Sequence, residues 1–427
     1  MTMETIRSGR LKQQYISLTH ESGLRIYLCP MKGFNTAYAM LGTPYGSVDV
    51  CFKTDRDEDF AEVPAGIAHF LEHKLFENED CDAFARYAKT GASANAFTSF
   101  NRTCYLFESA ENFADSLEIL LDFVTHPYFT QQTVDKEQGI IGQEIRMYED
   151  SPGWRVMFNL LCALYHKNPV RIDIAGTVES IAQINADLLY RCYNTFYNLS
   201  NMVLAVAGNF DVDEALRVAD KVLKKTEPVH IEYRRSDEPD TVCKRYAEQK
   251  LAVSTPLFDI GFKALPGDYT ENTLNSVLDE MLVEIIAGES SSLYRRLYDR
   301  SLINGVFSGE SMVGRDYICS MFSGESSDPK QVYEELCAEV TRLREKGIDE
   351  EIFRVAKATI YGRYISAFDS VEGVGGLLIN GAFGGVGMYE LVDAAASVTR
   401  EGLEKRLQEA FLVERSALSV IWPDSLR

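Results

Sequence analysis

Two histidines and a glutamate lie within five residues of one another in the stretch His69-Phe70-Leu71-Glu72-His73. If this stretch is helical, the two histidines lie one turn apart on one face, where two imidazoles can bind one metal ion. Glu72 is three residues after His69 and flanks the same face, so its carboxylate can reach a water on that metal. Apolar residues at the remaining positions can bury the other sides. The spacing therefore predicts a metal-binding helix with a base beside it.

A metal site of this kind needs a third protein ligand. Zinc in hydrolytic sites usually takes three ligands and keeps a fourth position for water, and His-x-x-Glu-His is the spacing of the inverted zinc hydrolases. Glu137 and Glu144 are seven residues apart, close to two helical turns, and so share one face of a predicted helix. One of them can bind the metal while the other orients a histidine. Taken alone, this pair is also typical of a solvated acidic face.

Composition excludes several classes of protein. The 427 residues, 46% hydrophobic and 25% charged, favour a globular chain with two or more domains. We expect neither a signal peptide nor a membrane span, because no apolar run reaches about 18 residues. The net charge of −21 opposes nucleic-acid binding. Nine scattered cysteines without a Cys-x-x-Cys pair favour free thiols and a cytoplasmic location, with Cys81 as a small core residue rather than a ligand.

The order of predicted elements repeats along the chain. Strands, helices and a final strand and helix fill residues 1–228, and a similar series fills residues 243–427. The polar segment between them, residues 229–242, is the predicted linker. We therefore expect an α+β fold of two similar α/β-sandwich domains, each a mostly antiparallel sheet covered by helices.

Further stretches give the chain a specific resemblance. His69–His73 followed by Glu137 and Glu144 resembles the two metal-site motifs of the insulinase/pitrilysin family of zinc peptidases. The stretch 91–98, Gly-Ala-Ser-Ala-Asn-Ala-Phe-Thr, is similar to the family's Gly-x-x-x-Asn-Ala-x-Thr strand. Residues 174–177 and 201–208 match later landmarks in the same order. The resemblance covers most of residues 60–215 and is weaker in the second half.

The resemblance implies a role for each of these residues. His69, His73 and Glu144 would bind Zn²⁺, and Glu72 would act as general base, with Glu137 as a further catalytic-site residue. The edge strand would receive a peptide substrate as an added strand; its residues are Asn95, Ala96, Phe97 and Thr98. The chain would then form one half of a clamshell. The alternatives are a structural homologue without activity and a peptide binder that does not cleave.

One segment departs from the family's pattern. Members usually carry an arginine and a tyrosine that face the active site from the opposite half, and Tyr298 and Asn304 occupy those positions here. Arg296 or Arg300 is a candidate replacement for the missing arginine. We therefore expect a related second chain as partner, with a homodimer as the alternative.

Overall fold

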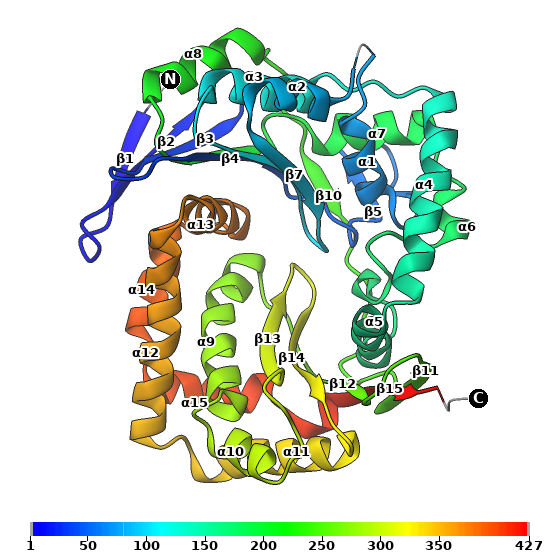
Figure 1. Cartoon of the computed structure of the whole chain (residues 1–427), viewed down its shortest axis with the longest axis vertical. Coiled ribbons are helices and arrows are strands. Elements are labelled where there is room, and N and C mark those ends of the chain that lie inside the picture. The colour runs from blue at the N-terminus through cyan, green and yellow to red at the C-terminus, as the bar shows by residue number, and fades with distance from the viewer. Residues whose placement is uncertain (1–2, 80, 425–427) are drawn as a thin grey trace.

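The computed structural model describes residues 3–79 and 81–424, and Figure 1 shows two layered units, one above the other. The first sheet has seven strands in the order β1 (Met3–Arg7), β2 (Gln14–Thr19), β3 (Arg25–Pro30), β9 (Val203–Gly208), β4 (Ala37–Thr43), β8 (Thr103–Ser109) and β7 (Ser93–Thr98). Neighbouring strands are antiparallel except β3 and β9, which are parallel. The strand that carries Asn95 to Thr98 is therefore an edge strand.

The second sheet repeats this topology. Its five strands are β11 (Tyr246–Leu251), β15 (Ser416–Pro423), β12 (Leu257–Ala264), β14 (Ile318–Glu325) and β13 (Ser308–Val313). β11 and β15 pair in parallel, and all other neighbouring strands of this sheet are antiparallel. The first sheet has the same arrangement from β3 onward: β3, β9, β4, β8 and β7 correspond in turn to β11, β15, β12, β14 and β13. The prediction of two similar, mostly antiparallel α/β units is confirmed.

Helices cover both sheets. Those associated with the first sheet are α1 (Ile67–Leu75), α2 (Ala83–Thr90), α3 (Phe113–Thr125), α4 (Gln131–Glu149), α6 (Val178–Ile181), α7 (Ala186–Phe196) and α8 (Val212–Val222), with a short 3-10 turn at Pro169–Arg171. Those of the second unit are α9 (Tyr269–Ala287), α10 (Ser292–Asp299), α11 (Pro329–Lys346), α12 (Glu350–Ser366), α14 (Met388–Ser397) and α15 (Arg400–Ala410), with 3-10 turns at Ala367–Asp369 and Val413–Arg415. No helix among the described residues is long and apolar enough to cross a membrane.

Two helices cross from one unit to the sheet of the other. α5 (Pro152–Leu164) packs on β12 and β15 of the second sheet, and α13 (Val371–Gly384) packs on β4 and β9 of the first (Figure 1). Gly208 permits the second of these contacts. Its φ is +111°, and a Cβ there would lie 2.3 Å from the carbonyl oxygen of Thr36 and 2.7 Å from a methyl of Val371. The exchange of helices joins the two units through buried apolar surface.

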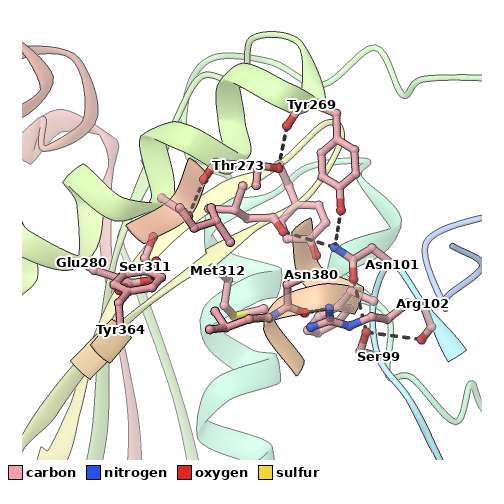
Figure 2. Close-up of a pocket in the computed structure, with 16 residues that line it drawn as sticks. Ser99, Asn101, Arg102, Tyr269, Thr273, Glu280, Ser311, Met312, Tyr364 and Asn380 are labelled. Carbon is pink, nitrogen blue, oxygen red and sulfur yellow. Dashed lines mark hydrogen bonds between the residues drawn. The ribbon is translucent and has the colours of Figure 1, made fainter. Parts of the chain in front are cut away.

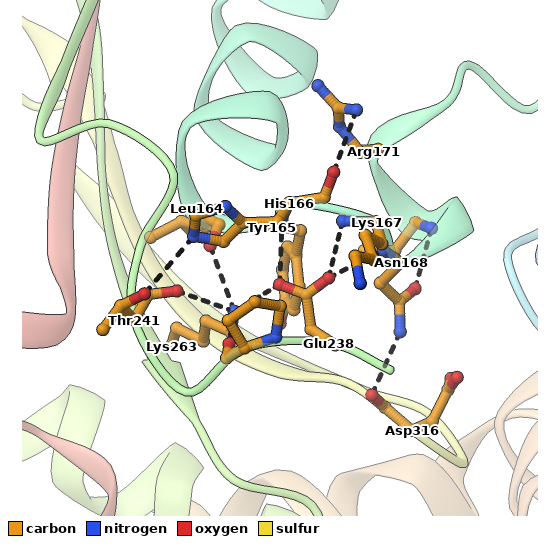
Figure 3. Close-up of polar contacts among 12 residues, drawn as sticks. Leu164, Tyr165, His166, Lys167, Asn168, Arg171, Glu238, Thr241, Lys263 and Asp316 are labelled. Carbon is orange, nitrogen blue, oxygen red and sulfur yellow. Dashed lines mark hydrogen bonds and ion pairs between the residues drawn. The ribbon is translucent and has the colours of Figure 1, made fainter. Parts of the chain in front are cut away.

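The predicted linker, residues 229–242, contains structure of its own. β10 (Ile231–Tyr233) pairs with β5 (Cys51–Thr54), which also pairs with β6 (Ala61–Glu62), in a small three-stranded sheet. The next part of the segment is fixed by Glu238, whose carboxylate accepts hydrogen bonds from the backbone N–H groups of residues 166–168 (Figure 3). The segment is therefore attached to both units along much of its length.

A buried lysine completes this attachment. The ammonium group of Lys263 on β12 lies 2.6 Å from Glu238 Oε1 and also donates to the carbonyl oxygens of Leu164, Pro239 and Thr241 (Figure 3). Lys263 is buried and Glu238 is largely buried, and the bonds to Lys263 and to the backbone lower the pKa of Glu238 although partial burial raises it. All nine cysteines are free thiols, as expected.

Candidate metal centre

α1 carries the two histidines and is held in place by a close backbone approach at its N-terminus. It starts after Gly66, which has a φ of +90°, and a Cβ there would lie 2.4 Å from the carbonyl oxygen of Ala175. Gly176 faces Ala65 in the same way, with a φ of +76°. Only glycines allow these two segments to touch, so residues 174–177 fix the position of the helix that presents His69 and His73.

α4 supplies the carboxylates opposite α1. Thr130 and Thr133 form a reciprocal cap at its N-terminus, and the helix continues without a break to Glu149. Glu137 and Glu144 therefore share a face, as the spacing of seven predicts, and α4 packs against α1 along this face. The fold thus brings Glu144 to His69 and His73, although Glu144 is 75 residues after His69 in the chain.

The three candidate ligands lie close enough together to share one metal ion, with one donor atom of each within 4.8 Å of the others. Glu144 Oε1 lies 3.7 Å from His69 Nε2, and Glu144 Oε2 lies 3.5 Å from His73 Nε2. Atoms bound to one tetrahedral zinc at about 2.0–2.2 Å lie roughly 3.3–3.6 Å from one another. Two imidazole nitrogens and one carboxylate are also a donor set that zinc prefers. The residues present therefore fit a zinc ion.

Further side chains orient these ligands. Glu137 Oε1 lies 3.0 Å from His73 Nδ1, which leaves Nε2 of that ring facing Glu144. The hydroxyl of Tyr148 donates to Glu144 Oε1 at 2.8 Å, and the Tyr148 ring stacks on Trp154 of α5. Glu137 contacts a candidate ligand rather than the predicted metal position. Of the two roles that spacing leaves open for Glu137 and Glu144, the geometry favours Glu144 as ligand and Glu137 as the orienting group.

Burial and neighbouring groups shift the pKa values of His69, His73 and Glu72. Burial, with a contribution from His73, lowers the pKa of His69 to about 3, so this ring is neutral and able to bind a metal at neutral pH. Burial opposes protonation of His73 too, but the hydrogen bond to Glu137 and the charges of Glu72 and Glu144 raise its pKa overall. Burial raises the pKa of Glu72, while a hydrogen bond from Thr98 acts in the opposite direction.

Glu72 connects the site to the edge strand. Thr98, the last residue of β7, donates its hydroxyl to Glu72 Oε2 at 2.7 Å. Asn95 and Ala96 line a cavity of about 600 Å³ together with Glu72, His73 and Glu137. Phe97 lies between Ala96 and Thr98 on β7 but is not part of the lining. The predicted substrate strand thus runs beside the predicted metal site.

Two residues were not assigned correctly from sequence. Tyr148 was missed, although its place four residues after Glu144 puts it on the same helix face. Cys81 is exposed and lines the cavity, so the expectation of a core residue was wrong; it lies between α1 and α2 rather than on a helix face that packs against the core. It is not part of the candidate ligand cluster found among the described residues.

The departing segment lies far from these ligands in the chain, on and after α10. Tyr298 is 52% exposed, and its ring stacks on Tyr294. Arg296 pairs with Glu339, and Arg300 pairs with Glu335, so each candidate replacement arginine is bonded to α11. Asn304 donates to Glu325.

Comparisons with known proteins agree with this geometry. The family model described as "Insulinase (Peptidase family M16)" matches residues 59–178, and the "Peptidase M16 inactive domain" matches residues 183–360. An uncharacterized zinc protease of Bacillus subtilis, YmfH, is 39% identical over 98% of this chain and 100% of its own length.

Two solved structures are also similar to this chain. A putative M16-like peptidase from Alicyclobacillus acidocaldarius is 34% identical, with a TM-score of 0.92 over 99% of both chains. The periplasmic protease PqqL of Escherichia coli is 18% identical, with a TM-score of 0.72 over 96% of this chain and 47% of PqqL, and so shares the fold. The present fold therefore corresponds to about half of that longer chain.

Proposed function

Because the chain belongs to the insulinase family, peptidase family M16, we propose that it is a zinc-dependent endopeptidase that cleaves peptides or unfolded segments. The observation that carries this proposal is the cluster of His69, His73 and Glu144 beside the buried carboxylate of Glu72. A peptide binder without activity would not need a base at this position.

Each side chain has a distinct role in the proposed reaction. A zinc ion held by His69, His73 and Glu144 would polarise the carbonyl of a peptide bond and lower the pKa of a water. Glu72, which is oriented by the hydroxyl of Thr98, would take the proton from this water. Glu137 keeps His73 in the orientation that directs Nε2 inward.

Edge-strand pairing explains how a peptide would be held. Among the residues that the structure describes, β7 pairs with β8 alone, so its other edge can accept an extended chain. Pairing through the backbone makes little demand on the side chains of the substrate. We therefore expect cleavage of flexible segments of varied sequence.

The experiment that tests the proposed function replaces Glu72. Glu72→Gln keeps the size of the side chain but removes the base, so hydrolysis of a quenched fluorescent peptide should fall by about 10²–10⁴-fold while zinc content stays unchanged. Glu149→Gln, an exposed carboxylate at the end of α4, is the matched control and should keep full activity. Wild-type turnover by Glu72→Gln with zinc bound would refute the role of Glu72. Zinc binding without turnover in the wild type, alone or with a partner, would favour a peptide binder.

We further propose that a related second chain completes the active site. A peptide bond at the metal needs donors on its far side to stabilise the developing negative charge, and in this family the facing half provides them. Tyr298 stands where the family's arginine is expected, and Arg296 and Arg300 are both paired with α11 glutamates. This chain also spans only 47% of PqqL. A homodimer would lack the arginine, so a partner that carries it is favoured.

This assembly is tested by assaying the chain alone and with a co-expressed related chain, against one flexible peptide. We expect poor turnover alone and higher turnover with the partner, lost when the partner's arginine is replaced. Full activity as a homodimer, unchanged by any partner, would refute the second chain and direct attention to Arg296 or Arg300.

A further inference from the structure

A second cavity lies at the junction of the two units, directly after the strand that carries Thr98. It has a volume of about 320 Å³ and begins at the turn between β7 and β8, residues 99–102. Helices α9, α12, α13 and α14 and strand β13 form its other walls. Figure 2 shows its labelled side chains, with Arg102 and Asn380 at one end and Glu280 and Tyr364 at the other.

Arg102 is the only cationic residue in the lining of this cavity. Its Nη1 donates to the side-chain oxygen of Asn380, and its Nε is buried without a hydrogen-bond acceptor. Within the ranges 3–79 and 81–424, no carboxylate lies within ion-pair distance of Arg102. In a chain with 64 acidic residues, an arginine in a cavity without a carboxylate partner lacks its usual acceptor.

The other polar groups near Arg102 are mainly donors without a full set of acceptors. The hydroxyl of Tyr269 accepts a hydrogen bond from Asn101 at 3.2 Å, which leaves its own proton free to donate. Asn380 uses its oxygen for Arg102, so its amide N–H groups are available. Such a set of donors is complementary to a carboxylate.

The far end of the cavity has the opposite charge. Glu280 is the only acidic residue of the lining and accepts a hydrogen bond from Tyr364 at 3.4 Å. The nearby Arg363 is paired with Glu284 instead. A bound anionic group is therefore repelled at this end and attracted at the Arg102 end, which fixes its position within the cavity.

The position of the cavity relates it to the proposed metal site. Thr98 touches Glu72, and the next residue, Ser99, already lines the second cavity. Asn95, which lines the first cavity, is four residues from Ser99, or about 13 Å along a strand. A peptide paired with β7 that continues past Thr98 would thus reach Arg102 within a few residues of the metal.

We propose that this cavity binds a carboxylate group carried by a peptide, either its C-terminus or an acidic side chain, through Arg102. The proposal rests on the proposed function in taking a peptide as ligand. It adds a preference that the metal site and the edge strand do not provide, because backbone pairing alone does not distinguish charges.

The test measures binding, which requires no turnover. The probes are four peptides of one backbone sequence without other acidic residues, each labelled with an uncharged BODIPY dye: one with a free C-terminus, one amidated, and two amidated versions with a single glutamate or glutamine. The protein is the full chain with Glu72→Gln and zinc added, and affinity is read from fluorescence anisotropy. We expect about tenfold tighter binding of at least one carboxylate peptide than of its neutral match. A difference in affinity between the free and amidated peptides identifies the C-terminus as the source of the carboxylate, and a difference between the glutamate and glutamine peptides identifies an acidic side chain.

Variants of Arg102 connect this preference to the cavity. In the Glu72→Gln background, Arg102→Met should abolish the preference, and Arg354→Met, which removes an exposed arginine paired only with Glu351, should leave it unchanged. If Arg102→Met does not fold, Arg102→Lys is used; it keeps the charge but loses the paired donors, so the preference should fall several-fold.

Equal affinities for acidic and neutral peptides, no binding of any peptide, or a preference that survives replacement of Arg102 would overturn the proposal. Its failure is distinct from failure of the proposed function. Loss of hydrolysis in the wild type leaves the binding preference testable, and equal binding of all four peptides leaves zinc-dependent hydrolysis intact.

Discussion

Replacing Lys263 tests how firmly the segment between the two units is attached. Lys263→Met keeps most of the side-chain volume but removes the ammonium group that Glu238 and three carbonyl oxygens share. Removing one partner of a buried ion pair costs roughly 3–5 kcal/mol. Glu238 keeps its three backbone N–H donors, so we expect a loss near the lower end, about 3 kcal/mol.

The assay is urea unfolding followed by tryptophan fluorescence. The chain has two tryptophans, and Trp154 on α5 and Trp422 on β15 both belong to elements packed in the second sheet, so they report on this region. Lys221→Met is the matched control, because its pair with Glu118 is exposed and should contribute about 0–1 kcal/mol. A stability for Lys263→Met equal to that of the wild type would refute the reasoning. A double-mutant cycle with Glu238→Gln should show coupling of at least about 1 kcal/mol.

Three other predictions follow from single contacts. Glu137→Gln should weaken zinc binding about 10–100-fold, measured by competition with a chelator, because His73 Nδ1 loses its carboxylate partner; unchanged affinity would contradict this. Burial raises the pKa of Asp259 from 3.8 to about 7, so the folded chain keeps a proton that the unfolded chain has released, and stability should fall as pH rises from about 4 to 7. Asp259→Asn should remove this fall, as unfolding midpoints between pH 4 and 7 would show; a parallel decline in both proteins would contradict it. Gly208→Ala should cost more than about 1 kcal/mol in urea unfolding, since its Cβ meets Thr36 and its φ is +111°; an unchanged midpoint would argue against the close packing of α13.

Local signals predicted much of the fold correctly. The turn-like residues 21–23 indicate two strands, 15–18 and 24–28, which the structure extends to Gln14–Thr19 and Arg25–Pro30. Gly91 ends α2 with a φ of +79°, as a helix-capping glycine does. The spacing of the candidate ligands could be read because a helix repeats every 3.6 residues. Spacing alone could not decide which of Glu137 and Glu144 binds the metal, because both lie on one helix face. Their three-dimensional positions were needed to distinguish the ligand from the orienting group.

Long-range pairing could not be predicted in this way. The apolar faces of α5 and α13 predict that each helix packs on something, but not that each crosses to the sheet of the other unit. β10 has only three residues, too few for a periodic pattern, and lies within a polar segment that reads as a linker. Glu238 and Lys263 are 25 residues apart and resemble ordinary surface charges until the fold buries them together.

The proposed function requires His69, His73 and Glu144 to bind one zinc ion. Zinc-edge anomalous diffraction from crystals of the zinc-loaded chain tests it most directly. We predict one strong peak at about 2.0–2.2 Å from Nε2 of both histidines and from the carboxylate of Glu144. A zinc peak elsewhere in the chain, with these three side chains not bound to metal, would contradict the account.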